Sequence, residues 1–155
     1  MKSYPLLSLL FLLLFISQTA TAQSSLVFEG AWIAEAPPSS RVMVAYMEIK
    51  NTSDQAEKIV SASSDNFKRI SFHQTQQEND MAKMKHMSTL AIPAKGQLVL
   101  EAGSHHIMLF NPVKKLKAGD QVSLDLKLEN GDVVNLVVPV KKQQMKQMDH
   151  SHMNH

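Results

Sequence analysis

The amino-acid sequence predicts an all-β fold, an antiparallel β-sandwich or barrel. Three observations support this prediction. Apolar and polar residues alternate within several short segments, turn-forming residues separate those segments at short intervals, and no sustained helical period is present. Seven or eight strands with little helix are expected, and we find no internal repeat.

The expected strands follow one another along the chain and are separated by polar or Pro-containing turns. The candidate segments lie within residues 26–34, 42–50, 58–64, 69–75, 90–103, 105–110 and 121–140. The clearest signal is in 121–128, where Val122, Leu124, Leu126 and Leu128 alternate with polar residues. Asn130-Gly131 then predicts a two-residue hairpin turn.

Residues 1–22 are expected to be a secretory signal peptide. They carry Lys2, an apolar run from Leu6 to Ile16, and the small-residue pattern Ala20-Thr21-Ala22, after which cleavage is expected. The apolar run is shorter than the roughly 20 residues that a spanning helix needs. No Cys follows the cleavage point, which disfavours a lipid anchor. The expected product is a periplasmic protein without membrane insertion, with one domain over 23–140 and a tail over 141–155.

Composition excludes several classes of function. The chain has no Cys, so zinc-thiolate sites, redox CxxC motifs and blue-copper centres are excluded. The formal net charge is +2 without a concentrated basic patch, which argues against nucleic-acid binding. We find no Ser/His/Asp order and no metal-hydrolase motif, so an enzyme is not expected.

The stretch GSHHIMLF, residues 103–110, contains candidate metal ligands in an apolar strand. On a strand, His106, Met108 and Phe110 share one face, while His105 lies on the other. The chain has ten Met and seven His, and several cluster between His73 and Met108. Thioethers are soft, neutral ligands, so a mixed Met/His set favours Cu(I) over Zn²⁺, Mg²⁺ or Ca²⁺.

The spacing of four of these residues resembles a known family. His73, Met84, His106 and Met108 reproduce the pattern H-x10-M-x21-H-x-M, which is the signature of the periplasmic PCuAC copper chaperones (DUF461). The segments VMVAYMEIKNTSDQAEKIVSASS and IPAKGQLVLEAGSHHIMLF are also similar to that family, and the resemblance covers about residues 26–140. Ser71 and Gln74 replace acidic neighbours of the first His, and one Gly before His105 is lost.

This resemblance implies a cupredoxin-like β-sandwich in which His73, Met84, His106 and Met108 bind Cu(I). It also implies a copper chaperone that delivers to the CuA centre of cytochrome oxidase, sometimes alongside Sco-type or thioredoxin-like partners. We expect a monomer. His86 and His105 are expected to be bystanders or transient contacts rather than ligands. Met43 and Met47 are expected to be core residues, because they alternate with Ala45 and Ile49. The choice of Met84 over Met81 and Met87 rests on the family spacing.

The last fifteen residues lack large aliphatic and aromatic side chains, so a disordered tail is expected there. Its Met and His content makes it a candidate second copper site, with the histidines suited to Cu(II) and the methionines to Cu(I). The candidate ligands in the tail are Met145, Met148, His150, His152, Met153 and His155.

Three other functions compete with a chaperone. A copper-sequestering resistance or storage protein would use the same ligands. A copper oxidase or reductase would need an open coordination position or a positioned acid and base. A purely structural secreted sandwich would bind no metal, so Cu(I) would not raise its thermal stability.

Overall fold

The computed structural model describes residues 25–78 and 81–143, and within these ranges the chain forms β-strands and no helix. The all-β prediction is therefore confirmed. The expected signal peptide 1–22 and the candidate tail ligands lie outside the described residues. Nothing in the described ranges is a helix able to cross a bilayer. The strands are β1 (Leu26–Ala34), β2 (Val42–Asn51), β3 (Glu57–Ser63), β4 (Phe67–Glu78), β5 (Met81–Met87), β6 (Leu90–Ile92), β7 (Gln97–Leu100), β8 (His105–Pro112), β9 (Gln121–Leu128) and β10 (Val133–Lys141).

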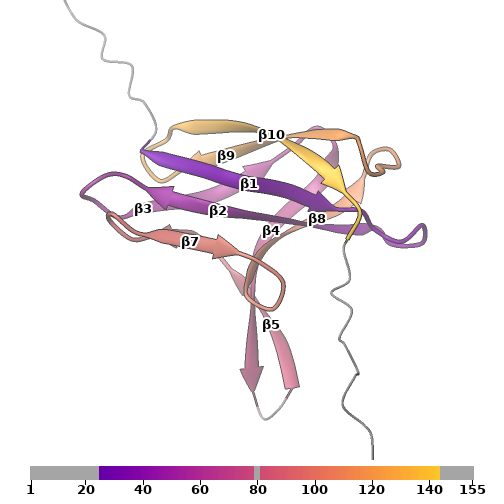
Figure 1. Ribbon diagram of the computed structural model, residues 1–155, viewed down its shortest axis with the longest axis horizontal. Coiled ribbons are helices and arrows are strands. Elements are labelled where there is room, and N and C mark those ends of the chain that lie inside the picture. The colour runs from indigo at the N-terminus through magenta and orange to yellow at the C-terminus, as the bar shows by residue number, and fades with distance from the viewer. Residues whose placement is uncertain (1–24, 79–80, 144–155) are drawn as a thin grey trace, which may run out of the picture.

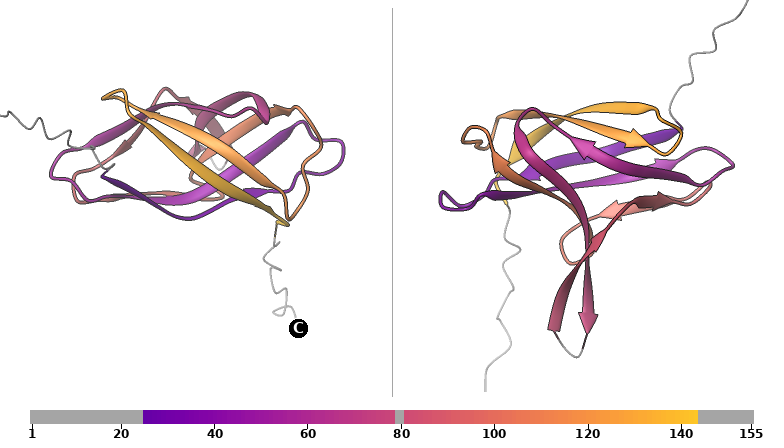
Figure 2. Two further views of the ribbon diagram at one scale, coloured as in Figure 1. Left: turned by 90° about the horizontal axis from the view of Figure 1, so that it is seen from above. Right: turned by 180° about the vertical axis from the view of Figure 1, so that it is seen from behind.

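Hydrogen bonds connect the strands in the order β5-β4-β8-β7-β2-β1-β10-β9-β3-β6. This ribbon of strands folds into two facing layers, which are joined where β1 meets β10 (Figures 1 and 2). The sandwich is mostly antiparallel, as expected. Two pairs are parallel: β1 with β10, where Ile33 lies opposite Val140, and β7 with β8, where Leu100 lies opposite His105.

The core lies between the two layers and is built from alternate residues of each strand. Met43, Ala45, Met47 and Ile49 of β2 face it from one layer. Val122, Leu124, Leu126 and Leu128 of β9 face it from the other. Burying one such large side chain stabilises the fold by about 1.5 to 3 kcal/mol. Met43 and Met47 are each 3% exposed, so their assignment to the core is confirmed.

The β4–β5 hairpin projects from the body of the sandwich (Figures 1 and 2). The first part of β4 packs on the core through Phe67 and Phe72, whereas its last residues are exposed. β5 is an edge strand, and all but its last residue are exposed. Because residues 76–86 contain no large aliphatic side chain apart from two methionines, this part of the hairpin has little apolar surface to bury.

Two sequence expectations on the strands need correction. The described residues form ten strands rather than seven or eight, and the Met-rich segment 81–87, which shows no alternation, is β5. The turn after β9 has three residues, because the Leu128 amide donates to the Asp132 carbonyl and the Gly131 amide donates to the Leu128 carbonyl. Gly131 has a φ of 95°, which is typical of a hairpin loop that ends in a bulge.

Candidate metal centre

Three neighbouring strands bring the four predicted ligands onto one face of the sheet. β4 lies between β5 and β8, and His73 of β4 is directly opposite His106 of β8. On the same face, Ser71 pairs with Met108, and Thr75 pairs with Met84 of β5. Residues opposite each other in a sheet project from the same face, so two imidazoles and two thioethers share one surface. The predicted choice of faces on β4 and β8 is therefore confirmed.

This face is the outer one, since the intervening residues point into the core. Phe72 is 3% exposed and Ile107 is fully buried. The rings of His73 and His106 lie nearly parallel, with centroids 6.0 Å apart and planes inclined by 19°. His106 is only 4% exposed although it lies on the outer face. Phe72 and Ile107 anchor the two strands in the core at the positions next to these imidazoles.

The hydrogen bonding of His106 leaves one ring nitrogen without a partner. Its Nδ1 lies 3.1 Å from the carbonyl oxygen of Ser104, which can only accept, so Nδ1 carries the hydrogen and donates. Nε2 then carries the lone pair, and this buried atom has no hydrogen-bond partner. A second hydrogen bond that fixes the tautomer and the ring orientation is the usual support of a metal-binding histidine.

His73 shows the same feature on the neighbouring strand. Its Nε2 lies 2.9 Å from the Ser71 hydroxyl, while its buried Nδ1 has no partner. Burial lowers the pKa of His73 below 6.5, and the nearby His106, His86 and Arg69 lower it further. The lowered pKa favours the neutral form of the imidazole, which is the form that binds a metal ion. Buried polar atoms are nearly always paired in folded proteins, so two unpaired nitrogens on adjacent residues call for a ligand.

The two methionines differ in exposure. Met108 is half-buried beside His106 on β8, whereas Met84 is 65% exposed on the edge strand. Within residues 25–78 and 81–143, no three His, Asp or Glu side chains are placed to hold one metal ion. An ion at these two imidazoles therefore needs ligands of another type, and thioethers are present on the same face. Imidazole with thioether is a ligand set that suits Cu(I).

Three other His and Met side chains of β5 and β8 lie on the opposite face of the sheet from the four predicted ligands. His105 pairs with Gln74 on the opposite face from His106, as predicted. Met81 and Met87 pair with Glu78 and Phe72, which places both on the opposite face from Met84.

His86 is expected to be a bystander or a transient contact, and the structure places it next to the candidate centre. It lies directly opposite His73, and the two rings meet edge-on with centroids 5.5 Å apart. The β4–β5 register could not be read from the sequence, since both faces of the hairpin's outer part are polar.

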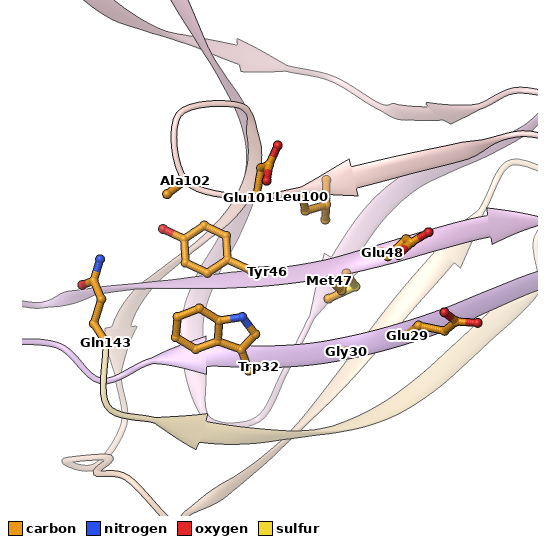
Figure 3. Close-up of a pocket in the computed structure, with 10 residues that line it drawn as sticks. All are labelled: Glu29, Gly30, Trp32, Tyr46, Met47, Glu48, Leu100, Glu101, Ala102 and Gln143. Carbon is orange, nitrogen blue, oxygen red and sulfur yellow. The ribbon is translucent and has the colours of Figure 1, made fainter. Parts of the chain in front are cut away.

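A hollow of about 450 Å³ lies on β1, β2 and the loop after β7 (Figure 3). Trp32 and Tyr46 lie side by side in it, with ring centroids 5.1 Å apart. None of the four predicted ligands lines this hollow. We place the candidate metal centre at the imidazoles, because a metal ion needs converging donor atoms rather than volume.

Comparison with known proteins connects this geometry to a family. The LpqE-like family model matches residues 26–140. The relative named "Putative lipoprotein Lxx21020", from Leifsonia xyli subsp. xyli, is 32% identical over 112 residues, which is 72% of this chain. The chain spans 66% of that relative's own length, slightly less than two thirds. The family's lipoproteins indicate an extracytoplasmic protein.

Solved structures agree with this assignment. The solution structure of CuI-DR1885 from Deinococcus radiodurans is 36% identical with a TM-score of 0.65, covering 83% of this chain and 87% of that one. The copper-bound PCuAC domain from PmoF2 has a TM-score of 0.66 at 17% identity, covering 77% of this chain and 95% of that domain, and so shows the fold alone. The expectation of a cupredoxin-like PCuAC fold is confirmed. The chain belongs to the LpqE-like family, and its fold is that of the PCuAC domains.

Proposed function

We propose that this chain is a periplasmic copper chaperone that binds Cu(I) through His73, Met84, His106 and Met108. Its proposed recipient is a cuproprotein, namely the CuA centre of cytochrome c oxidase, with Sco-type or thioredoxin-like proteins as further partners. In this proposal residues 1–22 are removed on export, residues 23–140 form the copper-binding domain, and the domain acts as a monomer.

One observation carries the proposal: the buried, unpartnered ring nitrogens Nδ1 of His73 and Nε2 of His106, which belong to residues paired across β4 and β8. Leaving a buried ring nitrogen unpaired costs about 1 to 3 kcal/mol, so two such atoms side by side are costly unless a ligand binds them. Met108 and Met84 lie on the same face. The structure of a relative with 36% identity is described as the CuI form.

The exposure of the site supports transfer to a recipient. Met84 lies on a projecting edge strand and is 65% exposed, so a recipient's ligand can approach the ion from that side. Neutral ligands need no deprotonation to bind and leave the charge of Cu(I) uncompensated. Both features favour stepwise ligand exchange over permanent burial of the ion.

Cu(I) affinity tests the ligand set. Met84→Leu and His106→Ala are each expected to weaken Cu(I) binding by at least about 10-fold in a chelator competition, because each removes a direct ligand. Met81→Leu is the matched control for the first variant, since Met81 is on the same strand, is 59% exposed, and faces the other way. His105→Ala is the control for the second. Unchanged affinity in Met84→Leu and His106→Ala would refute the ligand set.

Transfer separates a chaperone from a storage protein, which would use the same ligands. The loaded protein is mixed with an apo CuA domain, and the appearance of the CuA spectrum is followed over time. Transfer that outpaces dissociation into a chelator supports delivery. Retention of copper, together with copper sensitivity in a strain that lacks the protein, would instead support sequestration.

The tail is proposed as a second copper site formed by Met145, Met148, His150, His152, Met153 and His155, all of which lie outside the described residues. Its histidines suit Cu(II), and its tethering to the domain would raise the effective copper concentration there. Truncation after Lys142 is expected to lower both the copper stoichiometry and the loading rate. Unchanged values of both would refute a role for the tail.

A further inference from the structure

His86 stands beside the proposed site without belonging to its ligand set. It is exposed on β5, directly opposite His73, and meets that ring edge-on at 5.5 Å between centroids. Within the described residues, no hydrogen bond or ion pair engages its ring nitrogens. His106 lies opposite His73 on β8, and His86 lies opposite it on β5, which is the strand at the sheet edge.

Met84 and His86 are two residues apart on the same strand and therefore project from the same face, roughly 6 to 7 Å apart at the backbone. His86 is opposite His73, whereas Met84 is opposite Thr75, one diagonal position away. Both side chains are exposed. Exposed side chains change rotamer within nanoseconds, so either one can swing toward an ion on His73 without a change in the core.

The two side chains prefer different oxidation states of copper. A thioether is a soft ligand that suits Cu(I), whereas Cu(II) prefers imidazole nitrogen and oxygen ligands in a tetragonal arrangement. No three of the described His, Asp or Glu side chains converge on one ion, so His86 does not complete a three-imidazole site with His73 and His106 as they stand. A Cu(II) ion on His73 and His86 would fill its remaining positions with water, which reaches this exposed edge.

We propose that β5 supplies alternative ligands to copper held on His73: Met84 for Cu(I) and His86 for Cu(II). The domain site would then accept copper in either oxidation state by a change of the ligand supplied by β5, with His73 common to both forms. This inference rests on the proposed function, since it requires copper to bind at His73. It differs from the proposed tail site, because it locates Cu(II) binding within the folded domain.

The test uses the full mature chain with His150, His152 and His155 replaced by Ala, so that tail histidines do not contribute to Cu(II) binding. Dissociation constants for Cu(I) and Cu(II) are measured separately by chelator competition, and bound Cu(II) is examined by electron paramagnetic resonance. His86→Ala is expected to weaken Cu(II) binding by about 10-fold or more and Cu(I) binding by less than about 3-fold. It should also remove one imidazole nitrogen from the Cu(II) spectrum.

Met84→Leu is expected to show the opposite pattern, with Cu(I) binding weakened and Cu(II) binding nearly unchanged. His105→Ala, on the other face of β8, should change neither constant. If His86 only packs against His73, its removal would shift both constants together or neither, and either result would overturn the proposal. Failure of wild type to bind Cu(II) in this background would also overturn it. If Cu(I) binding is unchanged in all of the Met84, His73 and His106 variants, that result would instead refute the proposed function.

Discussion

Replacing His106 by Leu is predicted to stabilise the copper-free protein or leave its stability nearly unchanged, while abolishing the response to copper. The variant removes Nε2, the buried atom without a partner, and so recovers a cost of about 1 to 3 kcal/mol. It also loses the hydrogen bond from Nδ1 to the Ser104 carbonyl, worth about 0.5 to 1.5 kcal/mol. Leu keeps an apolar side chain at a position that is 4% exposed. The net change expected is between about zero and 2 kcal/mol in favour of folding.

Urea unfolding of the copper-free protein, followed by circular dichroism, measures this difference. With a slope near 1.5 kcal/mol per molar, a change of about 1 kcal/mol moves the midpoint by about 0.7 M. Thermal unfolding with added Cu(I) gives the second half of the result: the wild type should gain stability, and His106→Leu should gain little. His105→Leu controls for the loss of an imidazole on the same strand. Destabilisation of the copper-free His106→Leu variant by more than about 2 kcal/mol would refute the reasoning, because His106 would then be a satisfied core residue.

Three further predictions concern the protonation of His73, the core and the loop before β8. The pKa of His73 is lowered mainly by burial and then by His106, His86 and Arg69, so the unfolded chain binds more protons than the folded one. The copper-free protein should therefore lose stability as the pH falls below 6.5. Urea midpoints measured across this pH range should show a flatter slope for His73→Gln than for the wild type. Leu124→Ala, at a fully buried position, should cost about 2 to 5 kcal/mol of unfolding free energy, and a cost below 1 kcal/mol would contradict the described core. Gly103→Ala should lower the free energy of unfolding by about 1 to 2 kcal/mol, because Gly103 has a φ of 83°. It should also weaken Cu(I) binding, because the neighbouring Ser104 carbonyl orients His106. Unchanged affinity would show that this loop does not position the ligand.

Part of the fold follows directly from residue alternation. The pattern in β2 and β9 predicts two half-buried strands, and both bury every second residue as expected. β5 gives no such signal, because it is exposed on both faces, so neither its existence as a strand nor its register was predictable. The parallel β1–β10 contact that joins the layers is a long-range feature without a local pattern.

The candidate site divides in the same way. Alternation within β8 separates His106 from His105, and the structure places them on opposite faces. The faces of β4 were predictable from Phe72 and its polar neighbours for the same reason. The position of His86 opposite His73 depends on the β4–β5 register, which burial does not specify, and so it emerged only from the structure.

The central claim is that Met84 and Met108 bind Cu(I) on the same face as His73 and His106. Its most direct test is nuclear magnetic resonance of the protein labelled at its methionine methyl groups, with Cu(I) added to one equivalent. The methyl signals of Met84 and Met108 are predicted to shift, while those of Met81 and Met87, on the opposite face of β5, and of the buried Met43 and Met47 stay in place. Shifts of Met81 or Met87 without a shift of Met84, or no shift of Met108, would contradict the claim.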